Sequence, residues 1–384
     1  MGRQKRPTLE LKNLPPKAVI AAVDLGSDPE LEVSLDELVM LLENLEVPVS
    51  ARIVQKRKMP DPGSFLGAGK AEEIKEYAVP NEVTHLVVDD FLTPTQKSNL
   101  QKLTGLTVWD RAFVIMKIFE ARAHTSEAKL QVELAQYRYE IPSLKGLGHQ
   151  MSRTGGGIGT RGPGETEFER HRRKLDRRIK NIEKHLEEVR RRRGERRDRY
   201  RRDGVKLAAL VGYTNSGKST LLRELSRDSE IAAKDQLFST LDTVVRKISA
   251  RDGSSFLLSD TVGFIRKLPA ALVAAFRATL EEASNADLLL IVLDSADKDP
   301  GSAFEIVLET LKELEADALP RLVVLNKMDK SGEGAEYTAA ELRARGEKVV
   351  CVSALKRTGF EELLSEIKTI FMEEVAQKRE KDIS

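Results

Sequence analysis

The sequence predicts an α/β protein built from a small N-terminal parallel α/β domain, a long antiparallel helical hairpin and a C-terminal doubly wound domain. Short apolar strands alternate with helix-like segments at both ends of the chain, whereas the middle has only helical periodicity. A chain of 384 residues is also too long for one ordinary core. We expect boundaries at 1–123, 124–204 and 205–373, followed by a polar tail over 374–384.

The N-terminal domain is expected to form a four-stranded parallel sheet covered by helices. Ser34-Leu35-Asp36-Glu37 has the spacing of a capping box and predicts a helix that runs to Leu45. The other expected helices are 71–77 and 94–103, and the expected strands are 18–23, 49–54, 85–88 and 106–109.

The segment Gly67-Ala68-Gly69-Lys70 imitates a phosphate-binding loop but fails in spacing. Ser64 stands where the first glycine is required, and Ala71 follows the lysine in place of serine or threonine. A tight loop or an RNA-facing turn is therefore the default interpretation, and ATP binding by this domain stays open.

Two long helices are expected in the hairpin. The first covers 127–141 and the second covers 165–202, which would extend about 50 Å at 1.5 Å per residue. The glycine-rich segment 152–164 between them suits a flexible tip, either a nucleic-acid contact or a plain linker. The apolar residues of the second helix follow the a/d spacing of a coiled coil: Phe168, Leu175, Ile179, Ile182, Leu186 and Val189. An intermolecular coiled coil is the alternative to the hairpin.

Positive charge is concentrated in the second long helix. The whole chain has a net charge of +2, but residues 170–202 hold 17 Lys and Arg against 6 Asp and Glu. The run Arg190-Arg191-Arg192-Arg193 has no interleaved acid, which favours contact with nucleic acid over a solvated helix face.

The C-terminal domain repeats strand and helix, as a doubly wound nucleotide-binding domain does. The short turn Arg251-Asp252-Gly253 predicts an antiparallel hairpin at one edge of its sheet. The expected strands are 207–211, 244–250, 256–260, 288–294, 322–326 and 349–353.

A phosphate-binding loop follows the first of these strands. The residues Gly212, Tyr213, Thr214, Asn215, Ser216, Gly217, Lys218 and Ser219 fit the pattern G-x-x-x-x-G-K-[ST], and Thr220 opens a helix. Backbone N–H groups of such a loop face a polyphosphate, the Lys218 ammonium neutralises the β- and γ-phosphates, and the Ser219 hydroxyl ligates Mg²⁺.

Three further motifs end later strands of the same sheet. Asp260, Thr261, Val262 and Gly263 would supply a Mg²⁺ contact through Asp260 and an N–H for the γ-phosphate through Gly263. Asn326, Lys327, Met328 and Asp329 would read the base, because the Asp329 carboxylate can accept from guanine N1–H and N2–H₂ whereas adenine lacks matching donors. Ser353, Ala354 and Leu355 would offer an N–H to guanine O6.

With these motifs the chain resembles the translation-factor-related GTPases, and more closely the HflX family of ribosome-associated GTPases. The segments 155–165 and 129–135 look like signatures of that family. The resemblance implies a further nucleotide motif formed by Phe238, Ser239, Thr240, Leu241 and Asp242, with Thr240 as the switch residue that reaches Mg²⁺. Sequence alone would not choose Thr240 over Thr243. Lys218, Thr240 and Gly263 are then the expected catalytic groups.

The resemblance also implies a partner, the large ribosomal subunit with its RNA, and an activity, GTP-dependent dissociation of stalled or stress-inactivated ribosomes. Phe264 occupies the position where many GTPases carry the glutamine that orients water. We therefore expect slow hydrolysis alone and activation on docking. An RNA-remodelling NTPase and a GTP-switched coiled-coil scaffold remain as alternatives.

The composition predicts a cytoplasmic protein. The single cysteine, Cys351, lies in an apolar run, as a packed residue in a reducing compartment would. No apolar run reaches membrane-spanning length, and the polar start of the chain has no signal-peptide core. We expect a monomer, and peripheral contact with a membrane surface stays open.

Overall fold

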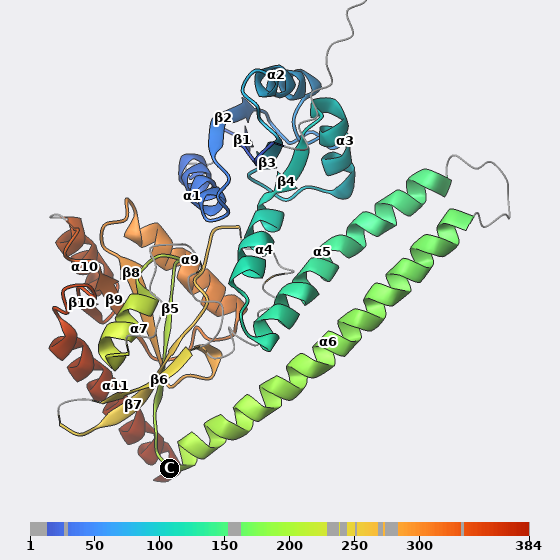
Figure 1. Ribbon diagram of the computed structural model, residues 1–384. Coiled ribbons are helices and arrows are strands. Elements are labelled where there is room, and N and C mark those ends of the chain that lie inside the picture. Colours follow the sequence, from blue (N-terminus) through green and yellow to red (C-terminus); the bar gives the residue numbers. More distant parts are fainter. Residues whose placement is uncertain are drawn as a thin grey trace, which may run out of the picture. The chain divides into compact units, whose positions relative to one another are not determined.

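The structure is a computed structural model, and it describes residues 14–26, 30–152, 163–228, 238, 244–249, 252–267, 272, 283–331 and 334–383 (Figure 1). Side chains of 143–152, 163–168 and 374–383 are outside this description. The chain divides into two compact units. One joins Met1–Ala121 to Glu133–Asn181, and the other joins Arg122–Val132 to Ile182–Ser384. The predicted hairpin, 124–204, is thus shared between the two units.

The first unit contains the predicted four-stranded parallel sheet, in the order β2-β1-β3-β4. Helices α2 and α3 cover one face, where they share a buried apolar cluster with β1, β3 and β4. The strands are β1 (Ala18–Asp24), β2 (Val49–Lys56), β3 (His85–Val88) and β4 (Thr107–Asp110), and the helices are α1 (Leu31–Glu43), α2 (Ala68–Ala78), α3 (Pro94–Thr104) and α4 (Arg111–Arg122).

The predicted capping box at Ser34 is wrong. Helix α1 begins at Leu31, so that Ser34 lies one turn inside it, buried, and its hydroxyl donates to Asp89 Oδ2 at 2.7 Å. A capping box does occur at α3, where the Thr93 side chain accepts from the Gln96 N–H and the Gln96 side chain accepts in return from the Thr93 N–H. Proline at the start of α3 fixes its first turn.

Arg111 at the start of α4 is fully buried and ties three elements together. Its guanidinium donates to Asp89 Oδ1 at 2.5 Å and to Glu37 Oε1 at 2.6 Å. It also donates to the Ser34 carbonyl at 3.2 Å. A charge removed from water is tolerated only when paired and hydrogen-bonded in this way. The network joins α1, the end of β3 and α4.

The two long helices extend further than expected toward the glycine-rich segment between them. Helix α5 covers Ser126–Ser152 and α6 covers Pro163–Arg202, and most of the predicted glycine-rich tip lies outside the described residues. In the first unit, Glu133 pairs with Arg178 at 2.9 Å and Glu140 with His171 at 3.5 Å. Numbers rise along α5 as they fall along α6, so these segments are antiparallel, as predicted. Leu175, Ile182 and Leu186 of the predicted seam are buried.

The second unit contains a six-stranded sheet in the order β10-β9-β8-β5-β7-β6. All pairs are parallel except β6 with β7, which form the predicted edge hairpin. Helices α9 and α10 share a core cluster with one face, and α7 and α11 share another with the opposite face. The strands are β5 (Leu207–Gly212), β6 (Val244–Ser249), β7 (Ser255–Asp260), β8 (Leu288–Asp294), β9 (Arg321–Asn326) and β10 (Val349–Cys351), and the helices are α7 (Lys218–Ser226), α9 (Pro300–Glu313), α10 (Gly334–Ala344) and α11 (Phe360–Ile383).

Helix α11 takes in most of the predicted polar tail, since it continues to Ile383. Within the described residues, no helix combines the length and the apolar character needed to cross a membrane.

Arg111→Met should destabilise the first unit by about 3–5 kcal/mol, because two buried carboxylates would lose their counter-charge. Arg52→Met is the matched control. Arg52 of β2 pairs at 2.7 Å with Asp36, which lies next to Glu37 in α1, but this pair is partly exposed. The expected loss is therefore about 1 kcal/mol or less. The single tryptophan of the chain, Trp109, lies in β4 and reports unfolding of this unit in urea. Equal losses for both variants would contradict the assigned role of Arg111.

Candidate functional site

The phosphate-binding loop leaves the carboxyl end of β5, in the middle of the six-stranded sheet, with glycine at the two positions that need it. Gly212 has φ +150°, and a Cβ there would strike the Val292 carbonyl oxygen on β8. Gly217 has φ +95°, and a Cβ there would strike the Asn326 amide nitrogen. Left-handed or otherwise strained backbone with no room for a side chain leaves glycine as the residue that fits. These contacts hold the loop against the neighbouring strands.

Lys218, the first residue of α7, is buried beneath this loop. Its ammonium donates to the Gly212 carbonyl at 3.0 Å and to the Tyr213 carbonyl at 2.7 Å. Burial lowers the pKa of Lys218 to about 8; the Asp260 charge opposes this shift and the Lys327 charge adds to it. The loop therefore holds a desolvated ammonium group, whose charged form a bound anion would stabilise.

Ser219 and Asp260, the two predicted Mg²⁺ contacts among the described residues, lie together. The Ser219 hydroxyl donates to Asp260 Oδ2 at 2.6 Å, and both side chains are buried. A hydroxyl and a carboxylate are hard oxygen donors of the kind that Mg²⁺ takes. Thr261 contributes differently, since its hydroxyl donates to the Leu210 carbonyl at 2.6 Å and ties β7 to β5.

Gly263 lies against the phosphate loop. A Cβ on Gly263 would stand 2.9 Å from Lys218 Nζ and 2.9 Å from Thr214 Cα. Two hydroxyls of the phosphate loop, Thr214 Oγ1 and Ser216 Oγ, are buried without a hydrogen-bond partner in the part of the chain that the structure describes. Buried polar atoms of this kind suit a site whose ligand supplies the missing partners.

Phe264 is turned away from the phosphate side. The Thr214 N–H donates to the Phe264 carbonyl at 2.8 Å, and the Phe264 N–H donates to the Gly212 carbonyl at 3.0 Å. Its ring is 1% exposed and packs in the same core cluster as Val211 and Ile291. Beyond it, the Arg266 N–H donates to the Tyr213 hydroxyl at 2.8 Å. The position of the usual catalytic glutamine is therefore part of the core.

Asn326 joins the phosphate loop to the loop after β10. Its amide nitrogen donates to the Ser216 carbonyl at 2.9 Å, and its amide oxygen accepts from the Ala354 N–H at 3.0 Å. Asn326 is buried, and it acts as a cross-link between motifs. Sequence reasoning assigned it only to base recognition.

Lys327 and Asp329 follow Asn326 in the loop after β9, and the Lys327 side chain also approaches Gly217. Lys327 has φ +64° and pairs with Asp294 at the end of β8, at 2.7 Å. The Ser353 hydroxyl donates to Asp329 Oδ1 while it accepts from the Lys356 N–H at 3.1 Å. That bond from Ser353 holds the pKa of the Asp329 carboxyl below its usual value. The ionised, oriented carboxylate is the form that accepts from guanine.

Asp294 was missed by sequence reasoning, although its place at the carboxyl end of β8 is a usable signal. Leu355 is exposed beside the buried Ala354. Met328 is half-buried and packs on the sheet core.

The motif that the family resemblance implied, 238–242, is described at one residue. Phe238 is buried and has φ +55°. Ser239, Thr240, Leu241 and Asp242 lie outside the described residues.

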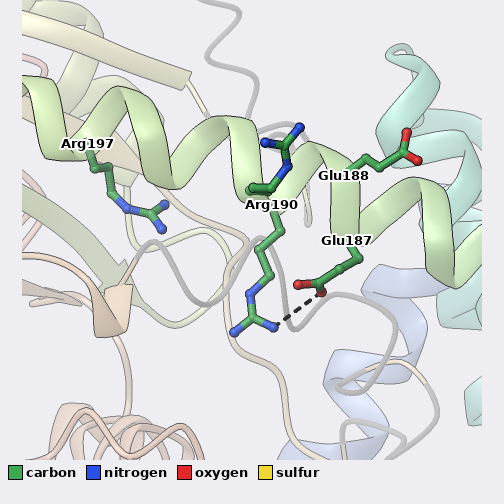
Figure 2. Close-up of a pocket in the computed structure, with 5 residues that line it drawn as sticks. Glu187, Glu188, Arg190 and Arg197 are labelled. Atoms are coloured by element: carbon green, nitrogen blue, oxygen red, sulfur yellow. Dashed lines mark ion pairs between the residues drawn. The ribbon is translucent and has the colours of Figure 1, made fainter.

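The basic run on α6 is partly neutralised. Arg190 pairs with Glu187 at 3.6 Å and Arg191 with Glu195 at 2.8 Å. Arg193 pairs with Glu127 of α5 at 2.6 Å, so this arginine holds the two helices together. Figure 2 shows the Glu187–Arg190 pair beside a shallow hollow of about 330 Å³ along α6, lined by Glu187, Glu188, Arg190, Arg191 and Arg197. Exposed pairs are weak, so a phosphate can displace them at small cost.

Family models match three successive parts of the chain. One described as GTP-binding GTPase N-terminal matches residues 32–120, and one described as GTP-binding GTPase Middle Region matches 122–200. A third, described as 50S ribosome-binding GTPase, matches 207–327. Among solved structures, the crystal structure of the SsGBP and GDP complex is similar at 25% identity and a TM-score of 0.49, covering 93% of this chain and 99% of that one.

Curated relatives match over most of their length. A GTPase HflX of Lacrimispora saccharolytica is 41% identical over 94% of this chain and 84% of that protein. A GTPase HflX of Escherichia coli is 43% identical over 82% of this chain and 73% of that protein. Together with the assembled phosphate and guanine motifs, these matches show that the chain belongs to the HflX family of GTPases and hydrolyses GTP.

Proposed function

We propose that this protein binds the large ribosomal subunit and, in its GTP state, separates ribosomes into subunits, as a rescue or recycling factor. The observation that carries the proposal is the burial of Phe264 beside the phosphate loop and the guanine motifs that the structure describes. A site without a water-orienting glutamine holds GTP longer, and a long-lived GTP state suits a switch that acts by binding. The partner comes from the matched model described as a 50S ribosome-binding GTPase.

In this proposal the phosphate side is made by the loop 212–219 with Thr220 and by Gly263. Lys218 neutralises the β- and γ-phosphates, and the Gly263 N–H meets the γ-phosphate. Ser219, Asp260 and the switch residue Thr240 would hold Mg²⁺, which offsets phosphate charge when bound. Asp329 reads guanine N1–H and N2–H₂, Ala354 offers its N–H to O6, and Lys327 flanks the base from its position on Asp294.

The ribosomal contact is assigned to the hairpin, chiefly to exposed arginines of α6. Arg190 and Arg191 exchange weak surface partners for RNA phosphates, and the affinity then depends on salt. The predicted domain limits, 1–123, 124–204 and 205–373, stay part of the proposal. An RNA-remodelling NTPase or a dimeric scaffold could have the same nucleotide site. Neither alternative accounts for the match to the model described as a 50S ribosome-binding GTPase.

Nucleotide affinity should fall as pH rises through about 8. The pKa of Lys218 is about 8 without nucleotide, and bound phosphates raise it because they favour the charged form. Binding at about pH 8.5 should therefore be accompanied by proton uptake, and binding near neutrality should take up little, because Lys218 is then already charged. Calorimetry of GDP binding in buffers of different ionisation enthalpy measures the uptake. No uptake at the higher pH would show that Lys218 does not face the phosphates.

Asp329→Asn should weaken GTP binding about 10- to 100-fold, since hydrogen bonds to a charged group are worth about 1.5–3 kcal/mol. Xanthosine triphosphate should gain, because it presents a carbonyl where guanine presents the amino group. Asp252→Asn, on the β6–β7 turn and paired with Lys368, is the control and should leave both affinities unchanged. Competition binding measures the two nucleotides. A retained preference for GTP in Asp329→Asn would place base recognition elsewhere.

GTP binding without hydrolysis should suffice to split ribosomes, because a ligand shifts an equilibrium only through its differential affinity for the two states. With a non-hydrolysable GTP analogue, light scattering should show dissociation, and the protein should stay on the large subunit in a gradient. GDP is the control and should give no splitting. Binding with the analogue but without splitting would mean that turnover drives the work, and the RNA-remodelling alternative would then be favoured.

A further inference from the structure

The side chain of Thr214, the third residue of the phosphate loop, has no structural use that accounts for its hydroxyl. The residue is 6% exposed, and Thr214 Oγ1 has no hydrogen-bond partner among the described residues. Its backbone N–H is already used by the Phe264 carbonyl. A buried hydroxyl left unpaired costs stability relative to a methyl group, so in a loop that binds phosphate it suits a ligand that pairs with it.

The position of this side chain identifies the ligand. A Cβ on Gly263 would stand 2.9 Å from Thr214 Cγ2 and equally 2.9 Å from Lys218 Nζ. The three residues therefore converge on one small region. Lys218 and Gly263 are the groups assigned to the γ-phosphate, and the Thr214 hydroxyl is one bond from the carbon that carries the contacting methyl. The Thr214 hydroxyl therefore lies close to the groups assigned to the γ-phosphate.

Neighbouring side chains are committed elsewhere. Phe264 is held in the core by its ring and by two backbone hydrogen bonds to the loop. Ser216 also has a buried hydroxyl without a described partner, but its carbonyl is tied to Asn326, beside Gly217 and toward the base side of the loop. Among the described side chains that GTP-site residue Gly263 approaches most closely, Thr214 is left as the uncommitted polar one.

We propose that Thr214 is a catalytic residue whose hydroxyl orients the attacking water against the γ-phosphate, in place of the missing glutamine. The inference rests on the proposed nucleotide site. The hydroxyl accepts a hydrogen bond from water and donates one to a γ-phosphate oxygen. The water oxygen bonds to the γ-phosphorus, the bond to the bridging β–γ oxygen breaks with its electron pair left on GDP, and the water proton passes to the departing phosphate. Thr214 ends the cycle unchanged.

The test compares Thr214→Val, which keeps the shape but removes the hydroxyl, with Thr214→Ser, which keeps the hydroxyl. Single-turnover GTP hydrolysis without ribosomes, GDP affinity and the melting temperature of the nucleotide-free protein are measured. Ser259→Ala is the matched control, because Ser259 in β7 has another buried hydroxyl without a described partner. The Ser259→Ala variant should hydrolyse GTP at the rate of the unaltered protein.

We expect Thr214→Val to hydrolyse GTP about 10- to 100-fold more slowly, with GDP affinity and melting temperature not reduced, and Thr214→Ser to restore the rate. A normal rate in Thr214→Val overturns the proposal. Parallel loss of rate, GDP affinity and melting temperature, without rescue by serine, assigns Thr214 a packing role and overturns it too. Failure of the unaltered protein to bind GDP would instead overturn the nucleotide-site assignment.

Discussion

The nucleotide site depends on one buried amide. Asn326 joins the Ser216 carbonyl of the phosphate loop to the Ala354 N–H of the loop after β10. Its nitrogen occupies the space that a side chain on Gly217 would need, so the glycine and the asparagine require each other. Because the amide is buried and satisfied at both ends, the phosphate and guanine halves are fixed relative to each other before any ligand arrives. Ligand binding then needs little reorganisation of these loops.

That rigidity extends to the segment after Gly263. Phe264 forms two backbone hydrogen bonds with the loop and buries its ring, so the usual catalytic position serves packing. In the proposed function, packing at this position stabilises the fold and fast hydrolysis is given up, as often happens when stability and activity compete. The buried ammonium of Lys218 has a related effect. Its desolvation costs stability when no phosphate is bound, and the same low-dielectric surroundings strengthen its attraction to a bound phosphate. Both features suit the slow, tightly held GTP state that we propose.

Much of this could be predicted from the sequence, and the limits are physical. Strand periodicity and turn chemistry predicted both sheets, the antiparallel edge at β6 and the antiparallel long helices. The Ser34 cap was wrong because the spacing of a capping box does not decide between a helix start and a buried turn that Arg111 and Asp89 hold. Pattern also cannot show that Phe264 points inward, or that Asn326 links two loops, because both depend on contacts distant in sequence.

A GTPase of this family without the usual glutamine should hydrolyse GTP slowly alone and faster when bound to its partner. GTP turnover by the purified protein, measured alone and with purified large subunits, small subunits or protein-free ribosomal RNA, tests this most directly. We predict strong stimulation by large subunits and little by the other two, since ordered RNA and protein of the docking site are both required. Stimulation by naked RNA equal to that by large subunits, or none by any of the three, would contradict a ribosome-activated GTPase.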